Sequence, residues 1–132
     1  MATKEVLRAA RREECRQLSD LAMRSKAHWG YDAAFMEACR DELTVRPEDI
    51  DARCVTVLER DAKVVGFYGI DGDPPAGELW WLFVEPSAIG SGAGRTLWNH
   101  ATDGAARMGM TTLRIESDPG AEGFYLAMGA VR

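Results

Sequence analysis

Apolar side chains recur along the chain at two kinds of spacing, and these spacings predict the order of helices and strands. Recurrence at three and four residues is typical of an amphipathic helix, whereas alternation or a short apolar run between turn residues is typical of a strand. The predicted strands are residues 4–8, 54–59, 64–70, 78–84 and 111–116. The predicted helices are residues 11–25, 32–43, 92–108 and 121–128.

The sequence of these elements predicts how the strands pair. The runs 54–59 and 64–70 are joined by a short turn, which predicts a β-hairpin. Residues 78–84 are apolar at nearly every position, as in a central strand covered on both faces. A helix separates that strand from residues 111–116, which implies a right-handed crossover and a parallel pair. We therefore predict a single α/β (α+β) domain over residues 1–132.

Residues that start and stop helices refine these boundaries. Asp32 precedes a helical pattern, and its carboxylate is expected to cap the first turn. Asp118 followed by Pro119 has the same form and predicts a capped helix start. Pro47 is expected to end the second helical stretch.

Composition narrows the class of protein. With 132 residues, 46% hydrophobic and 28% charged, the chain matches one globular domain. Its longest apolar run, residues 79–84, is far shorter than the ~20 residues of a membrane-spanning helix. The basic residues near the N-terminus precede no apolar core of a secretory signal, so we expect a cytoplasmic protein with no membrane partner. A net charge of −5 argues against nucleic acid as the principal partner.

Metal-binding and redox residue types are too scattered to predict a site. The three cysteines, Cys15, Cys39 and Cys54, have neither CxxC nor zinc-site spacing, and we interpret them as reduced, structural side chains. The two histidines and the dispersed acids form no recognisable set of ligands. No metal cofactor is expected.

A glycine-rich turn lies between a predicted strand and a predicted helix. Gly90, Gly92 and Gly94 allow the backbone to approach an anion closely, and the helix start offers free N–H groups and a positive dipole end. The turn does not fit a dinucleotide-binding GxGxxG, because Arg95 occupies the third glycine position, and it lacks the P-loop lysine. The structural alternative is a turn that only leads a strand into a helix. Further donors or charge are available from Ser91, Arg95 and Thr96.

Together with a second segment, this turn resembles the Gcn5-related N-acetyltransferase (GNAT) family. The family's phosphate loop, Q/R-x-x-G-x-G/A, corresponds to residues 89–94, with Ile89 in place of the usual Arg or Gln. The family's second pattern, N-x-x-A-x-x-(aromatic or Leu)-Y followed by Gly, corresponds to residues 118–129, with Asp118 in place of Asn. The order of elements over residues 6–132 also matches.

The resemblance implies a GNAT-like acyl-CoA N-acyltransferase fold that binds acetyl-CoA as co-substrate. This fold has a central mixed, mostly antiparallel sheet with a splayed parallel pair and helices on both faces. The phosphate loop acts mainly through main-chain N–H groups, so Ile89 is expected to weaken coenzyme binding without abolishing it. The residues implied to bind the coenzyme are Phe83, Val84, Ile89, Gly90, Ser91, Gly92, Ala93, Gly94, Arg95, Thr96, Asp118, Ala121 and Phe124.

The implied reaction is direct transfer of the acetyl group to a primary amine in a ternary complex. Tyr125 is implied to be the general acid for the leaving thiolate; packing beside Phe124 is the alternative. Glu78 is a possible general base, because deprotonating an alkyl ammonium of pKa about 10.4 at pH 7 costs roughly 4 to 5 kcal/mol. A solvent-exposed carboxylate is an equally good interpretation of Glu78. Backbone N–H groups near Phe83 and Val84 are expected to stabilise the oxyanion and to pair with pantetheine.

The amine acceptor is expected near the turn between the first two helices. His28, Trp29 and Tyr31 lie there, and one of the two tryptophans of the central strand, Trp80, is expected to line the same cleft. The acid-rich segment 32–51 is best explained as a solvated helix face, and the alternative is a local negative field that would attract a small-molecule or peptide amine. Core packing is likewise an alternative for the aromatic residues.

Two expectations concern assembly and activity. Family members continue beyond the equivalent of Val131 with a closing strand, so we expect that strand to be missing here and an open sheet edge to be covered by a second copy in a homodimer. A non-catalytic acetyl-CoA-binding module of the same fold is the main alternative function. A small nucleotide- or phosphate-binding domain is the third.

Overall fold

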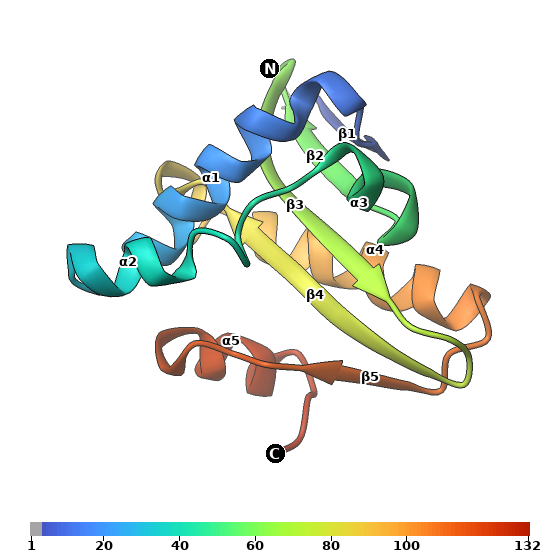
Figure 1. Ribbon diagram of the computed structural model, residues 1–132. Helices are drawn as coiled ribbons and strands as arrows, with labels where there is room; N and C mark the ends of the chain where they lie inside the picture. Colours follow the sequence, from blue (N-terminus) through green and yellow to red (C-terminus); the bar gives the residue numbers. More distant parts are fainter. Residues whose placement is uncertain (1–3) are drawn as a thin grey trace.

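The computed structural model describes residues 4–132 (Figure 1). Every predicted strand and helix is present, and one further short helix, residues 47–52, was not predicted. The strands are β1 (Glu5–Ala9), β2 (Thr56–Arg60), β3 (Lys63–Asp71), β4 (Ala76–Val84) and β5 (Thr112–Ile115). The helices are α1 (Cys15–Ala27), α2 (Ala33–Cys39), α3 (Pro47–Ala52), α4 (Ala93–Arg107) and α5 (Glu122–Ala127). Short 3-10 turns are Arg12–Glu14, Pro86–Ala88 and Pro119–Ala121.

The five strands form one mixed sheet in the order β1-β2-β3-β4-β5. The first three junctions are antiparallel, and the β4–β5 junction is parallel. The predicted hairpin and the predicted parallel pair are therefore confirmed. In the hairpin turn, Asp61 and Ala62 have φ angles of 50° and 67°, the left-handed conformation that suits the twist of two-residue hairpins.

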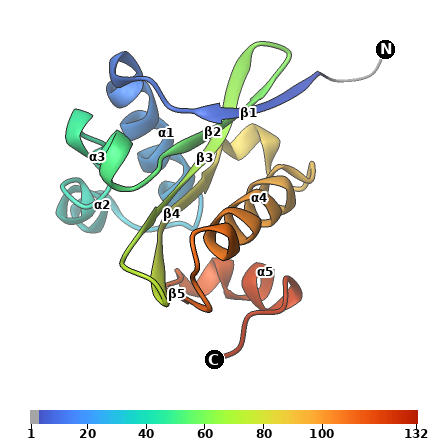
Figure 2. The same ribbon diagram turned by 90° about the vertical axis from the view of Figure 1, so that its right-hand side faces the viewer.

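Helices cover both faces of the sheet, as expected for the fold (Figure 2). Helices α1, α2 and α3 lie on one face, and their core is centred on Leu18, Leu21 and Phe67. Helices α4 and α5 lie on the other face, where α4 packs Leu97 against Leu58 and the rest of a second core. Within the sheet, β4 is an interior strand, with β3 along one edge and β5 along the other.

Helix termini account for the differences from prediction. Asp32 caps α2 as predicted, since its Oδ1 accepts from the Phe35 N–H at 2.8 Å. Pro47, predicted to end a helix, instead begins α3, because a first-turn proline loses no helical hydrogen bond. The predicted cap by Asp118 is wrong: its side chain makes no capping bond, and α5 begins only at Glu122.

The parallel pair parts along its length. The pairing of β4 with β5 runs from Ala76 opposite Thr112 to Leu79 opposite Ile115. Beyond that point β4 continues to Val84 without β5 beside it. Within residues 4–132, β5 has no neighbour in the sheet other than β4, so its outer edge is unpaired. Cover of that edge by a second copy stays a prediction.

A substitution at Gly66 on β3 tests how closely α4 packs against the sheet. A Cβ at Gly66 would lie 2.7 Å from Leu97 Cδ1 and 2.8 Å from the Phe83 carbonyl oxygen. Gly66→Ala is expected to lower the free energy of unfolding by about 1–3 kcal/mol, measured by urea denaturation. The control is Gly104→Ala within α4, where the nearest atom is 3.9 Å away, and it is expected to stabilise by about 0.5–1 kcal/mol. Unchanged stability of Gly66→Ala would contradict this packing.

Candidate functional site

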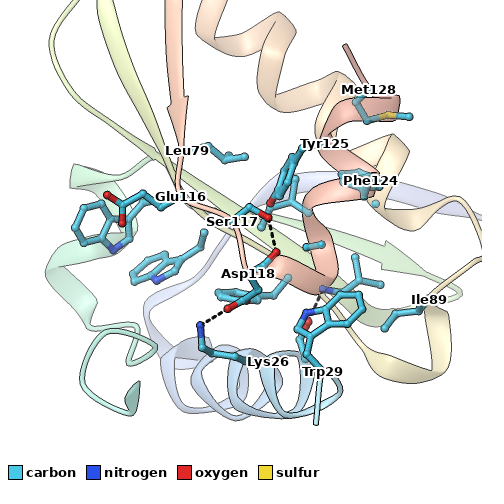
Figure 3. Close-up of a pocket in the computed structure, with 18 of the residues that line it drawn as sticks. Lys26, Trp29, Leu79, Ile89, Glu116, Ser117, Asp118, Phe124, Tyr125 and Met128 are labelled. Carbon is cyan, nitrogen blue, oxygen red and sulfur yellow. Dashed lines mark hydrogen bonds and ion pairs between the residues drawn. The ribbon is translucent and has the colours of Figure 1, made fainter. Parts of the chain in front are cut away.

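A cavity of about 870 Å³ fills the wedge where β4 and β5 part (Figure 3). Its walls come from α1, β4, the glycine-rich turn, the loop after β5 and α5. The volume is in the range of cofactor and substrate sites. Segments that are far apart in the sequence therefore meet around one cavity that opens to solvent.

Main-chain groups of β4 face this cavity at alternate residues. The N–H of Glu85 donates to the Val65 carbonyl at 2.8 Å, so Glu85 and, two residues before it, Phe83 direct their main-chain groups toward β3. Leu82 and Val84 then direct theirs toward the wedge. This corrects one expectation: the N–H of Phe83 belongs to the β3–β4 ladder, and the gap-facing donor beside Val84 is Leu82. The Phe83 side chain still lines the cavity.

A bulge distorts β4 where the wedge begins, next to the last residue paired with β5. Gly69 is opposite Trp81, whereas Ile70 is opposite Leu79, so Trp80 is an extra residue on β4. Trp80 is 40% exposed and lines the cavity as expected, with the Arg53 guanidinium carbon 4.1 Å from its ring centroid. Trp81 is buried, and its indole N–H donates to the Glu42 carbonyl at 3.0 Å.

The glycine-rich turn presents unpaired main-chain donors. Gly90 and Gly92 have φ angles of 82° and 89°, a conformation that favours glycine. The first helical bond of α4 runs from the Thr96 N–H to the Gly92 carbonyl at 3.0 Å. Within the described chain, no acceptor is bound by the N–H groups of Gly90, Gly92, Ala93, Gly94 and Arg95. These donors lie at the start of a 15-residue helix, which is the arrangement that the predicted anion cradle requires; anion binding there stays a prediction.

The hydroxyl groups of the turn point back into it. The Ser91 hydroxyl donates to the Ala88 carbonyl and accepts from Arg60 Nη1 at 2.6 Å. The Thr96 hydroxyl donates to the Gly92 carbonyl at 3.1 Å. Arg60, on β2, thus holds the turn from outside, a contact that no local sequence signal indicated. Ile89 is 43% exposed and lines the cavity.

Phe124 and Tyr125 join α5 to α4. A Cβ at Gly94 would lie 3.0 Å from Phe124 Cε1, so glycine is needed there for this contact. Tyr125 packs against Trp98, with ring centroids 5.8 Å apart, and its hydroxyl points into the cavity (Figure 3). Burial, together with the negative charge of Asp118, raises the pKa of Tyr125 to about 12. The phenol is therefore uncharged at physiological pH.

An ion pair crosses the cavity from α1 to the loop after β5. Lys26 Nζ lies 2.7 Å from Asp118 Oδ1 (Figure 3). The Tyr31 hydroxyl donates to the same oxygen at 2.9 Å. Burial opposes the charge on Lys26, but the hydrogen bond and charge of Asp118 outweigh it and raise the pKa of Lys26. Beside this pair, Trp29 lies over Gly120, where a Cβ would come within 2.5 Å of the indole.

The predicted residues are distributed unevenly around the cavity. Those that line it are Glu78, Trp29, Trp80, Phe83, Val84, Ile89, Gly90, Gly92, Gly94, Arg95, Asp118, Ala121, Phe124 and Tyr125. Those outside its lining are His28, Tyr31, Ser91, Ala93 and Thr96. Ser25, Lys26, Glu42 and Glu116 line it but were not predicted, because only tertiary packing brings α1 and the chain before α3 to this wedge.

The ionisable groups near the β4 bulge are mostly carboxylates. Glu78 is half-buried, and no basic side chain among the described residues forms an ion pair with it. Glu42 and Glu116 line the same part of the cavity. Among residues 4–132, no group of three or more His, Cys, Asp or Glu side chains is arranged to hold a metal ion. No helix in that range is long and apolar enough to cross a bilayer.

The structure combines a mixed sheet whose parallel pair splays apart with a cavity in the gap between those two strands. The model of the acetyltransferase (GNAT) family matches residues 5–130, and the chain belongs to this family. A search of curated proteins finds no match.

Solved structures with the same fold include PaiA N-acetyltransferase from Thermoplasma acidophilum in complex with coenzyme A. It is 18% identical with a TM-score of 0.82, over 96% of this chain and 89% of that one. A GCN5-related N-acetyltransferase from Ralstonia eutropha JMP134 is 19% identical with a TM-score of 0.79, over 98% and 94%. The ribosomal-protein-S18-alanine N-acetyltransferase from Escherichia coli is 16% identical with a TM-score of 0.70, over 96% and 77%. At these identities the likeness shows the fold.

The Lys26–Asp118 pair is tested by a double-mutant cycle. Lys26→Met leaves a poorly exposed carboxylate without its counter-charge and is expected to destabilise by about 1–3 kcal/mol. Lys26→Met combined with Asp118→Asn is expected to recover most of that loss, giving a coupling of at least about 1 kcal/mol in urea denaturation. The exposed pair Glu37–Arg40 is the control, with an expected coupling of no more than about 0.5 kcal/mol. Equal couplings for the two pairs would count against a structural bridge.

Proposed function

We propose that this protein is an N-acetyltransferase that moves the acetyl group of acetyl-CoA directly to a primary amine. One observation carries the proposal: a single cavity joins the unpaired donors of the glycine-rich turn to the Tyr125 hydroxyl along the open edge of β4. Donors at Gly90 to Arg95 suit a diphosphate. The gap-facing carbonyl groups of Leu82 and Val84 suit the two amide N–H groups of the pantetheine arm, which leaves the thioester near Tyr125.

The proposed reaction needs one base, one oxyanion donor and one donor for sulfur. Glu78, directly or through a water, takes a proton from the amine, whose nitrogen then attacks the thioester carbonyl carbon. The carbonyl oxygen becomes an oxyanion, for which Leu82 offers a main-chain N–H. When the intermediate collapses, the carbon–sulfur bond breaks and the sulfur receives a hydrogen bond and then a proton from Tyr125. The nitrogen loses its second proton as the amide forms, and that proton, directly or through a water, restores the Tyr125 phenol. Glu78 releases the first proton to solvent, which completes the cycle.

The raised pKa of Tyr125 defines its part in this scheme. An ordinary thiol has a pKa of about 8.5, well below the value of about 12 for Tyr125. The phenol therefore keeps its proton until negative charge develops on sulfur, and it acts first as a hydrogen-bond donor. Its protonated form is lost only as the pH rises through about 12, so this residue does not limit activity at neutral pH.

The charge of the cavity favours an amine as acceptor. Glu42, Glu78 and Glu116 lie near the β4 bulge, away from the glycine-rich turn, and they would attract a cationic ammonium group before its deprotonation. The fold neighbour named for S18-alanine acetylation acts on a protein amine. The acceptor here is either a small-molecule amine or a peptide amine.

Ligand binding and turnover test the function in sequence. Acetyl-CoA and CoA, but not ATP at equal concentration, are expected to raise the melting temperature, since a ligand at 100 times its Kd stabilises by about 2.7 kcal/mol. Thiol release from acetyl-CoA over a panel of amines is then expected to rise above the rate without amine. Coenzyme binding with no thiol release across small and peptide amines would favour the non-catalytic module. Stabilisation by ATP alone would favour a nucleotide-binding domain.

Tyr125→Phe tests the role of the phenol. Removing the donor to sulfur is expected to lower kcat by about 100-fold or more with little change in KM for acetyl-CoA. The shape of the pH–rate profile between pH 6 and 10 is expected to stay the same, because the Tyr125 pKa of about 12 lies above that range. Tyr68→Phe is the matched control: its buried phenol bonds to His100 at 2.7 Å outside the cavity, and kcat is expected to stay within 2-fold. Wild-type kcat in Tyr125→Phe would remove Tyr125 from the mechanism.

A further inference from the structure

Ser25 differs from the other hydroxyl residues of the long helices. Ser19 in α1 donates to the carbonyl four residues earlier at 2.7 Å, and Thr96 and Thr102 in α4 do the same at 3.1 and 3.0 Å. Ser25, also in α1, makes no such bond within the described chain. Its Oγ instead accepts the N–H of Val84 at 3.3 Å. The side chain is thus turned away from its own helix and toward the open edge of β4.

This orientation leaves a buried donor without an acceptor. Ser25 is only 9% exposed, yet it lines the cavity in the wedge. A hydroxyl group has one hydrogen to donate, and none of the hydrogen bonds among residues 4–132 is donated by Ser25, whose Oγ acts only as the acceptor for Val84. Leaving a buried donor unsatisfied costs about 1–3 kcal/mol, so an acceptor supplied from the cavity would be favoured.

The location of Ser25 indicates which part of a ligand it meets. Val84 is the last residue of β4 before the glycine-rich turn. Tyr125, on α5, lines the same cavity. A ligand held by its diphosphate at Gly90 to Arg95 and by its sulfur near Tyr125 must pass Ser25 with the segment between them. In acetyl-CoA that segment is the pantetheine arm, whose two amides carry carbonyl acceptors.

We propose that the Ser25 hydroxyl donates a hydrogen bond to an amide carbonyl of the pantetheine arm, in place of the N–H of Val84. This inference rests on the proposed function. The N–H of Val84 donates to Ser25 Oγ, so it is not available to a ligand. At this position the donor that faces the cavity is the Ser25 hydroxyl. Accepting from Val84 also polarises the hydroxyl, which strengthens it as a donor. Ser25 is thus a binding residue for the arm, with no part in the chemistry.

Ser25→Ala tests whether the Ser25 hydroxyl contacts the pantetheine arm or the nucleotide part of the coenzyme. Two ligands are compared by calorimetry: CoA, and adenosine 3′,5′-bisphosphate, which lacks the arm. Ser25→Ala is expected to raise the Kd of CoA by about 3- to 10-fold, the range of one neutral hydrogen bond, and to change the Kd of the nucleotide by less than about 2-fold. In the acetyl-transfer assay, KM for acetyl-CoA is expected to rise with kcat within about 2-fold.

Ser19→Ala is the matched control. Ser19 is on the same helix and also accepts a main-chain N–H from another segment, that of Val45 at 2.8 Å, but it does not line the cavity. Its loss is expected to lower stability without a selective effect on CoA. Should Ser25→Ala not fold, Ser25→Cys keeps the side chain and weakens the donor, and the same selective loss is expected.

Two results would overturn the inference. An unchanged Kd for CoA in Ser25→Ala would mean that the Ser25 hydroxyl makes no hydrogen bond to the arm that contributes to binding. Equal weakening of CoA and the bisphosphate would mean that Ser25 only supports the fold. Failure of the wild-type protein to bind CoA would instead refute the proposed function, and this inference with it.

Discussion

The parting of β4 from β5 is the constraint on which the site depends. Parallel pairing ends at Leu79 and Ile115, and β4 then runs on to Val84 with main-chain groups that no strand satisfies. Such groups need other partners wherever water is excluded. Ser25 supplies one partner from the helix above, and the cavity leaves the others to a ligand.

Contacts between distant segments hold the two walls of the wedge at their separation. The Lys26–Asp118 ion pair joins α1 to the loop after β5, and the Phe124 ring rests on Gly94 at the start of α4. Burying two charges is costly, and their attraction offsets that cost only while the geometry is kept. The pair therefore defines one arrangement of the walls more than it adds stability. The usual asparagine of the family at position 118 would not need a lysine partner.

The two ends of the cavity differ in charge. Unpaired N–H groups and the positive dipole end of α4 surround Gly92 at one end, and the carboxylates of Glu42, Glu78 and Glu116 surround the β4 bulge at the other. A ligand with an anionic end is oriented by this field before any close contact forms. The glycine-rich turn was predictable because its chemistry resides in consecutive residues, whereas the carboxylate end comes from three separate segments.

Features that depend on neighbouring residues were predictable from the amino-acid sequence. The hairpin, the parallel pair, the glycine-rich turn and the cap at Asp32 all follow from local periodicity and turn chemistry. Tertiary structure decided the rest. Asp118 has the residue type and position of a helix cap, yet its carboxylate binds Lys26, 92 positions away. Ser25 likewise binds Val84 across 59 positions. A side chain with several possible partners is committed only when packing brings one of them within reach, and local sequence does not encode that proximity.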